Sequence, residues 1–362
     1  MEDQKEKILY LESLRGIAAL MVAMSHFRID SFIYQNQFVG NSYLWVDFFF
    51  VLSGFVIALN YQFKIKNFHS LFTFQAKRFV RLYPLHLILL FIFLGLEYAE
   101  YYKEQIFNNA GIAPAFSKNT FPTFVHNIFL THNIFLNDVS WNYPSWSISA
   151  EFYTYFLFGL ILLKTKSSHS SILWLSSILV LLSLLILFNT SMETSQGIFR
   201  CLYSFFLGVI IFNINNIYNF KVSVLFSYMI FILALLGIYF AGPPQFININ
   251  IVMPIIFASL IYSLLRSRPS NQLIRILNLN FLIFLGAISY SIYMIHALIW
   301  KLISIFLRYA IDIEGSQELA MITDNEFFSG MILISSMGIL VFVANITYKY
   351  IELRFNKYRK YL

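Results

Sequence analysis

A series of apolar segments, each long enough to cross a bilayer, constrains the fold of this chain more than any other feature. There are about ten, judged by the usual length of roughly 20 predominantly apolar residues. They centre on residues 11–28, 42–60, 82–97, 146–163, 171–188, 197–213, 223–241, 246–265, 281–306 and 327–348. Hydrophobic residues make up 59% of the sequence and charged residues 12%, against about 45–50% and about 25% in soluble domains. The sequence therefore predicts an all-α, polytopic membrane bundle that forms one domain over residues 1–362.

The charges of the connecting segments predict how the bundle is oriented. Most basic residues, 16 of the 25, lie in segments 61–81, 164–170, 214–221, 266–280 and 349–362. The alternate connections, such as 97–144 and 307–326, are acidic or neutral. Since basic loops remain in the cytoplasm, we expect both termini to be cytoplasmic. The first apolar segment follows a mixed-charge start and lacks a small-residue cleavage site, so we expect an uncleaved helix.

Composition also excludes several kinds of protein. The net charge of +7 is explained by cytoplasmic loops, so no nucleic-acid partner is inferred. Cys201 is the single cysteine, which excludes an intramolecular disulfide and a thiolate cluster for metal. The spacing of the histidines gives no metal-ligand motif, and no GxSxG, Walker or GxGxxG sequence occurs. We therefore expect neither a metal nor a tightly bound cofactor.

The first apolar segment carries two ionisable residues, Arg15 and His26. On a helix their spacing is about three turns, or roughly 16 Å along the axis, so both project from nearly the same face. Ionisable residues within a span usually face the bundle interior or a wet cavity. We expect Arg15 near the cytoplasmic surface and His26 deeper, toward the outer leaflet. In the alternative, Arg15 extends to the interface and His26 only packs.

The second and third segments add further polar groups. Asp47 lies near the outer end of the second segment and Ser53 near its middle. Asp47 either pairs with His26, which would fix the tautomer of the imidazole, or caps the start of its helix. Arg78 and Arg81 lie one turn apart at the expected cytoplasmic start of the third helix. Guanidinium pairs suit phosphate recognition, although ordinary positive-inside flanking also explains them.

Two later segments place polar side chains on one helix face. On the fourth, Glu151 shares a face with Ser147 and Tyr155; it could act as an acid or base, orient a histidine, or form a structural hydrogen bond. The ninth aligns the side chains of Ser289, Tyr293 and His296. We interpret His296 as a packing or hydrogen-bonding residue.

Two segments outside the spans complete the expectations. The long connection 97–144 contains Pro114, Pro122 and Pro144, which argue against one continuous helix. We expect it to cover the outer mouth of the bundle, with a disordered connector as the alternative. Glu352 is expected in a structural salt bridge at the cytoplasmic surface.

Taken together, these motifs resemble the acyltransferase-3 family of integral membrane acyltransferases. Arg15 and His26 resemble its Arg-x10-His pair, VDFFFVLSGFVI its second-helix signature, and KRFVRLYP its Arg-x-x-Arg motif. SWSISAEF and LGAISYSIYMIH resemble its later signatures, and IELRF contains the common closing glutamate. Members transfer an acyl group, usually acetyl from acetyl-coenzyme A, to hydroxyls that often belong to bacterial surface polysaccharides. Many members carry a fused SGNH esterase-like domain; the sequence ends at Leu362 without one, so the resemblance implies a stand-alone form.

The resemblance suggests a division of roles. Arg15, Arg78 and Arg81 would bind the phosphates of a cytoplasmic acyl-CoA. His26 would act as general base or acyl carrier, with Asp47 or Glu151 orienting it. Ser53, Ser147, Ser289, Tyr293 and His296 are further site candidates.

The expected partners are acyl-CoA as co-substrate, a saccharide acceptor and the lipid bilayer, in a bacterial inner (plasma) membrane. A multi-span transporter of a small solute or lipid is the alternative function, and transfer to a lipid or protein is the alternative acceptor chemistry. Neither the acceptor nor the oligomeric state follows from the sequence.

Overall fold

The computed structural model is helical throughout the part of the chain that it describes. That part comprises residues 2–107, 114–136, 139–190, 193–218, 220–242, 249–268, 270–310, 325–359 and 361–362, and no β-strand occurs in it. Eight of its helical segments are long and apolar enough to cross a membrane. They contain α3 (Trp45–Tyr61), α4 (Phe68–Phe107), α7 (Trp146–Thr165), α8 (His169–Asn189), α9 (Gly197–Ile217), α11 (Met253–Arg266), α14 (Ser289–Ala310) and α15 (Glu326–Thr347). The predicted polytopic helical bundle is confirmed.

Two of the predicted spans fall short of those eight for identifiable reasons. Helix α10 (Val224–Tyr239) is apolar but has only 16 residues. Helix α1 (Glu2–His26) is long enough, but Glu12 and Arg15 reduce its apolarity. It packs against α3, α13 (Asn280–Ala287) and α14. Because protein rather than lipid surrounds α1, its charged residues are tolerated inside the bundle.

The third predicted span was too short. Helix α4 has 40 residues, which corresponds to about 60 Å, twice the hydrocarbon thickness of about 30 Å. It includes Pro84 and extends beyond the predicted segment at both ends. Arg78 and Arg81 therefore lie inside a continuous helix rather than at its start.

The ninth predicted span is two helices that meet at Ile288. α13 ends at Ala287 and α14 begins at Ser289, whose Oγ donates to the Gly286 carbonyl at 2.8 Å. Gly286 also faces Gly16 of α1, and a Cβ at Gly286 would overlap the Glu12 carbonyl. Small residues permit such close helix contact, and the contact brings Arg15 next to Ser289.

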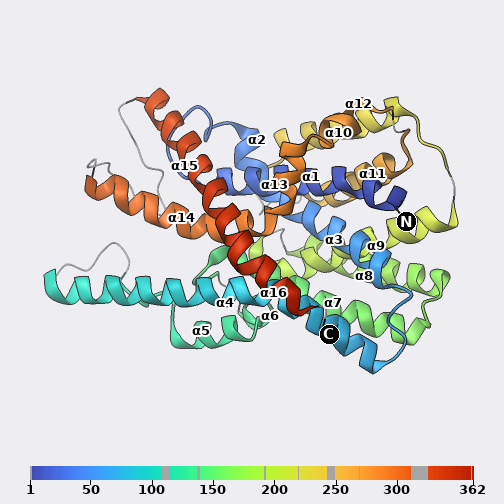
Figure 1. Ribbon diagram of the computed structural model, residues 1–362, viewed down its shortest axis with the longest axis horizontal. Helices are drawn as coiled ribbons and strands as arrows, with labels where there is room; N and C mark the ends of the chain where they lie inside the picture. Colours follow the sequence, from blue (N-terminus) through green and yellow to red (C-terminus); the bar gives the residue numbers. More distant parts are fainter. Residues whose placement is uncertain are drawn as a thin grey trace.

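The segment 97–144 is not one helix, as its prolines predicted. Beyond the end of α4 it forms α5 (Phe121–Ile128) and α6 (His132–Phe135), followed by the 3-10 turn Tyr143–Ser145. Most of the acidic connection 307–326 lies outside the described residues. In Figure 1 both chain ends lie toward the right, whereas the C-terminal end of α4 extends to the left. Termini on one side agree with an even number of crossings; which side is cytoplasmic stays a prediction from the positive-inside rule.

Candidate active site

Two cavities lie inside the bundle and meet at Val46 and Tyr293, which line both. We call the smaller, of about 180 Å³, the inner cavity. Its polar lining consists of Glu12, Arg15, Ser53, Arg78, Arg81, Ser147, Glu151, Tyr155, Ser289, Tyr290 and Tyr293. The larger, of about 610 Å³, is the outer cavity and is lined in part by His26.

The two cavities follow one another along the helices. On α1, Arg15 lines the inner cavity and His26 the outer one; on α4, Arg81 lines the inner cavity and Glu97 the outer one. Helices α3, α7 and α14 also contribute to both. The predicted separation of Arg15 from His26 along one helix thus becomes a separation between two neighbouring chambers.

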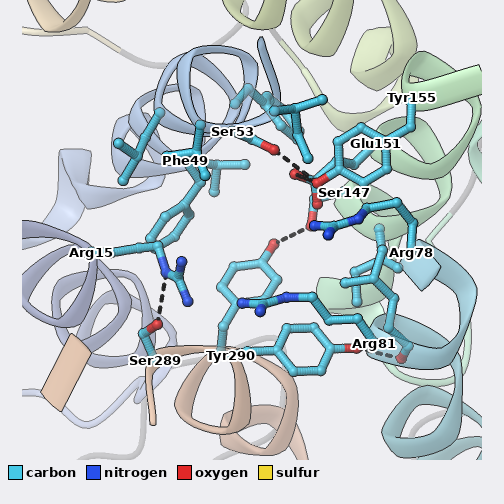
Figure 2. Close-up of a pocket in the computed structure, with 18 of the residues that line it drawn as sticks. Arg15, Phe49, Ser53, Arg78, Arg81, Ser147, Glu151, Tyr155, Ser289 and Tyr290 are labelled. Atoms are coloured by element: carbon cyan, nitrogen blue, oxygen red, sulfur yellow. Dashed lines mark hydrogen bonds between the residues drawn. The ribbon is translucent and has the colours of Figure 1, made fainter. Parts of the chain in front are cut away.

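Three guanidinium groups enter the inner cavity from opposite walls. Figure 2 shows Arg15 on one side and Arg78 and Arg81, both from α4, on the other. Arg15 donates to Ser289 Oγ at 2.9 Å and pairs with Glu12 at 3.1 Å. Arg78 donates to the Tyr61 hydroxyl at 2.9 Å and lies over that ring, with its guanidinium carbon 5.0 Å from the centroid. Among the described residues, neither Arg78 nor Arg81 forms a close ion pair, although Glu352 and Glu12 attract Arg81 electrostatically.

The wall opposite Arg15 carries a chain of hydroxyl groups that ends on a carboxylate (Figure 2). The Tyr155 hydroxyl donates to Glu151 Oε1 at 2.5 Å and lies 2.8 Å from Ser53 Oγ. The predicted face of Ser147, Glu151 and Tyr155 does line one cavity. Glu151 does not contact His26, however, so the interpretation that it orients His26 is wrong: the two lie in different cavities.

Tyr293 forms part of the wall between the cavities. Ser147 Oγ donates a hydrogen bond to the Tyr293 hydroxyl at 2.9 Å. The Tyr293 hydroxyl in turn donates to the Pro144 carbonyl at 3.0 Å. These contacts join α14 to the turn that precedes α7. The Tyr293 side chain is therefore held in place where the two cavities adjoin.

His26, which lines the outer cavity, lies beside the buried His296. His26 Nδ1 is 3.1 Å from His296 Nε2, and the two rings are nearly parallel, at 14°, with centroids 5.0 Å apart. Tyr143 packs edge-on against both. The hydrogen-bonding interpretation of His296 is confirmed, and its partner is the histidine that we expected to be catalytic.

Asp47 does not pair with His26, which corrects the prediction. Its Oδ2 lies 2.7 Å from Nη2 of Arg200, and Arg200 Nε donates to Oδ1 at 3.3 Å. Ser204 Oγ also donates to Oδ1 at 3.3 Å. The ion pair lies between helices α3 and α9, which pack closely against each other. Because the Asp47 carboxylate is bound to Arg200 and Ser204, it is not available to orient His26.

The rest of the outer cavity combines aromatic rings with opposite charges. Trp141, Tyr143, Trp146 and Trp300 contribute rings, and Lys118, Val139 and Trp141 belong to the predicted covering segment. Lys301 of α14 approaches Glu97 of α4 at 3.6 Å. Glu97 accepts from the Asn119 amide at 2.7 Å, which ties this segment to α4. Part of the segment thus lines the outer cavity; that it covers the outer mouth of the bundle stays a prediction.

A buried histidine beside the outer cavity, His132, has a lowered pKa. His132 of α6 lies 3.2 Å from Ser145 Oγ, in the turn that holds Tyr143. Burial, and to a lesser extent the neighbouring His86, lowers the pKa of His132 to about 3. The ring is neutral at physiological pH and supports the turn without charge.

Sequence reasoning missed three residues that line the cavities, which are Arg200, Tyr143 and Tyr290. It also missed that Glu352 is buried. Glu352 belongs to the π-helical turn Tyr348–Glu352 and accepts from Ser291 Oγ at 2.5 Å. It is buried, so the predicted surface location is wrong, but it still interacts electrostatically with a basic residue, Arg81. Tyr290 donates to the Leu82 carbonyl at 2.5 Å. An arginine inside an apolar segment, as at Arg200, was the available signal that a buried acid must lie nearby. In the described part of the chain, no three His, Cys, Asp or Glu side chains are arranged to hold a metal ion.

The helical bundle and its two internal cavities define a polytopic membrane protein with a polar site between its helices, the class that includes membrane-bound acyltransferases. Residues 8–348 match the acyltransferase-3 family, described as "Acyltransferase domain", and the chain belongs to that family. It is similar to the acyltransferase MdmB of Streptomyces mycarofaciens, with 26% identity over 320 residues, covering 80% of this chain and 78% of that protein. It is also 39% identical to the "Protein 2 in picA locus" of Rhizobium radiobacter over 92 residues, which are 24% of this chain and 43% of that protein. No solved structure matches.

Proposed function

We propose that this protein is an O-acyltransferase that moves an acyl group, with acetyl as the expected case, from cytoplasmic acyl-CoA to a hydroxyl of a cell-surface polysaccharide or its lipid-linked precursor. The observation that carries the proposal is that two internal cavities adjoin and share the lining residues Val46 and Tyr293. Arg15, Arg78 and Arg81 line the inner cavity, and His26 lines the outer one together with Arg28 and Arg200. Family membership favours this function over the transporter alternative.

The inner cavity suits the phosphates of the donor. Arg15, Arg78 and Arg81 outnumber Glu12 and Glu151 there, which leaves a formal excess of one positive charge. Guanidinium groups bind phosphate oxygens through paired N–H donors. The thin pantetheine arm is the part of the donor that would extend past Tyr293 toward His26. Arg15 and His26 are roughly 16 Å apart along the helix. With its phosphates at Arg15, the donor would bridge this distance with the pantetheine arm and bring the thioester to His26.

The outer cavity suits the acceptor and the chemistry. His26 takes the proton of the acceptor hydroxyl while that oxygen forms a bond to the thioester carbonyl carbon. The carbon–sulfur bond then breaks, and coenzyme A leaves with the electron pair as a thiolate. In the alternative, His26 itself accepts the acyl group and passes it to the hydroxyl. Aromatic faces beside polar groups, such as Trp141 and Tyr143, supply a lining on which a sugar ring can pack.

The test is acetyl-coenzyme A binding to purified protein by isothermal titration calorimetry. Wild type is compared with Arg78→Ala/Arg81→Ala and with Lys64→Ala/Lys66→Ala, which removes two exposed charges outside the cavity. We expect binding to be lost only in the arginine variant. His26→Ala should bind acetyl-coenzyme A but release no coenzyme A in the presence of saccharides. Absence of binding by wild type, or transfer by His26→Ala, would contradict the proposal.

A further inference from the structure

The hydrogen bonds of His296 determine where its proton lies. Its Nδ1 is 2.6 Å from the Tyr293 carbonyl oxygen, and a carbonyl oxygen only accepts hydrogen bonds. Nδ1 must therefore carry a proton. The opposite tautomer would place the lone pair of Nδ1 against the lone pairs of that oxygen.

The second nitrogen of His296 is then an acceptor. The ring is completely buried. Its hydrogen-bond partners are the backbone of Tyr293 and Ile292 and the imidazole of His26, and in the described part of the chain no carboxylate pairs with it. A buried imidazole without a counter-ion stays neutral. Since a neutral ring has one N–H, Nε2 of His296 presents a lone pair to His26 Nδ1 at 3.1 Å.

From these contacts we infer that His296 is a positioning residue, which fixes His26 in the tautomer with its proton on Nδ1 and the lone pair on Nε2. In water the neutral histidine side chain carries its proton mainly on Nε2, so the partner reverses the ordinary preference. Which nitrogen of a histidine acts is set by the hydrogen bond of the other. The significance for catalysis rests on the proposed function; the tautomer itself does not.

The surroundings hold both rings in this arrangement. Tyr143 packs edge-on against His26 and His296, with centroids 5.0 and 5.7 Å away. The Asn142 amide donates to the Met294 carbonyl at 3.1 Å, which attaches this turn to α14 two residues before His296. His26 is less buried than His296 and lines the outer cavity. The ring of His26 also forms a hydrogen bond to the backbone of Val22, one helical turn back. His26, rather than His296, is therefore the histidine that an acceptor in this cavity can reach.

The arrangement also helps His26 after it takes a proton. A proton moving from an acceptor hydroxyl to Nε2 makes His26 cationic, and its Nδ1–H then forms a charge-assisted hydrogen bond to His296, which is stronger than the neutral one. A neutral imidazole does here what a carboxylate does in other base-activating arrangements. This assigns to His296 the task that the sequence had suggested for Asp47.

The experiment is solid-state ¹⁵N NMR of protein labelled on histidine and reconstituted in lipid, with His26→Ala assigning the His26 signals by their loss. Wild type should show a protonated Nδ1 and an unprotonated Nε2 for His26. His296→Gln retains an oxygen acceptor near the position of Nε2 and should keep this tautomer. His296→Leu removes the acceptor, and the proton should shift to Nε2. A wild-type His26 protonated on Nε2 overturns the inference, even if neither His296 variant folds.

Activity separates this inference from the proposed function. Release of coenzyme A from acetyl-coenzyme A with saccharide acceptors should fall about 10- to 100-fold in kcat for His296→Leu, the range seen when the orienting partner of a metal-binding histidine is removed. KM for acetyl-coenzyme A should stay unchanged, and His296→Gln should restore most of the rate. Equal rates for His296→Leu and wild type contradict the positioning role. Transfer by His26→Ala contradicts the proposed function and leaves the tautomer standing.

Discussion

Arg200 and Asp47 form an ion pair inside the bundle, with Nη2 2.7 Å from Oδ2 and neither side chain more than 2% exposed. The pair joins α9 to α3, and Arg200 also stacks over Trp146, its guanidinium carbon 5.4 Å from the ring centroid. Removing one partner leaves an uncompensated buried charge.

We therefore predict that Arg200→Met costs about 3–5 kcal/mol of folding stability, the usual effect of breaking a buried pair. Asp47→Leu/Arg200→Met should recover part of that loss, since replacing both charges by apolar groups removes the unpaired one. Thermal unfolding in detergent measures both variants. A double variant less stable than Arg200→Met would show that the pair itself is not the source of the effect.

Arg78 should resist conservative replacement. It donates to the Tyr61 hydroxyl and stacks on that ring, and lysine cannot reproduce a planar group that does both. We expect Arg78→Lys to weaken acetyl-coenzyme A binding about tenfold, equivalent to about 1.4 kcal/mol. Lys77→Ala, on the same helix but outside the cavity lining, is the control and should bind normally. Calorimetry reports both affinities; equal binding by Arg78→Lys and wild type would contradict the bidentate role.

The close approach of α1 and α13 should make Gly286 intolerant of substitution. A Cβ there would overlap the Glu12 carbonyl, whereas a Cβ at Gly95 of α4 meets no atom within 4 Å. We predict that Gly286→Ala lowers the unfolding temperature and displaces Arg15 from Ser289, which weakens donor binding. Gly95→Ala should be neutral or slightly stabilising, because alanine favours helix by about 0.5–1 kcal/mol. If both variants unfold at the wild-type temperature, the two helices are not in the contact described.

Tyr293 and Ser147 should behave as one coupled unit. The hydroxyl of Tyr293 is bonded to Ser147 and to the Pro144 carbonyl within the wall between the cavities. Tyr293→Phe and Ser147→Ala should each cost about 0.5–1.5 kcal/mol. In the double variant the cost should be less than the sum, because both changes remove the same bond. Additive losses in thermal unfolding would exclude the direct hydrogen bond.

Acid should destabilise the turn that carries Tyr143. The folded-state pKa of His132, about 3, lies below its ordinary value of 6.5. Below pH 6.5 His132 therefore binds a proton in the unfolded chain but stays neutral in the folded chain. The free energy of unfolding falls as the pH drops from 6.5 toward 3. His132→Gln should show a smaller decrease in unfolding temperature between pH 7 and pH 5 than wild type. Identical decreases would mean that His132 is not held neutral by the fold.

Sequence reasoning succeeded where the signal is local. The apolar segments predicted the helical bundle, and helical periodicity placed Arg15 and His26 at two depths along α1, where they line the inner and outer cavities. The same periodicity grouped Ser147, Glu151 and Tyr155 on one face. It failed at the ends of helices: α4 continues to Phe107, because helical hydrogen bonding does not stop where apolarity does.

The sequence alone thus determined the class of fold, the axial order of the charges and the family to which the chain belongs. Only the tertiary structure decided which polar groups meet: Asp47 with Arg200, 153 residues away, and His26 with His296, 270 residues away. The physical reason is that periodicity fixes which face of a helix is polar, while side-chain packing between helices fixes which face it meets. The partner of His26 is therefore a property of the packed bundle.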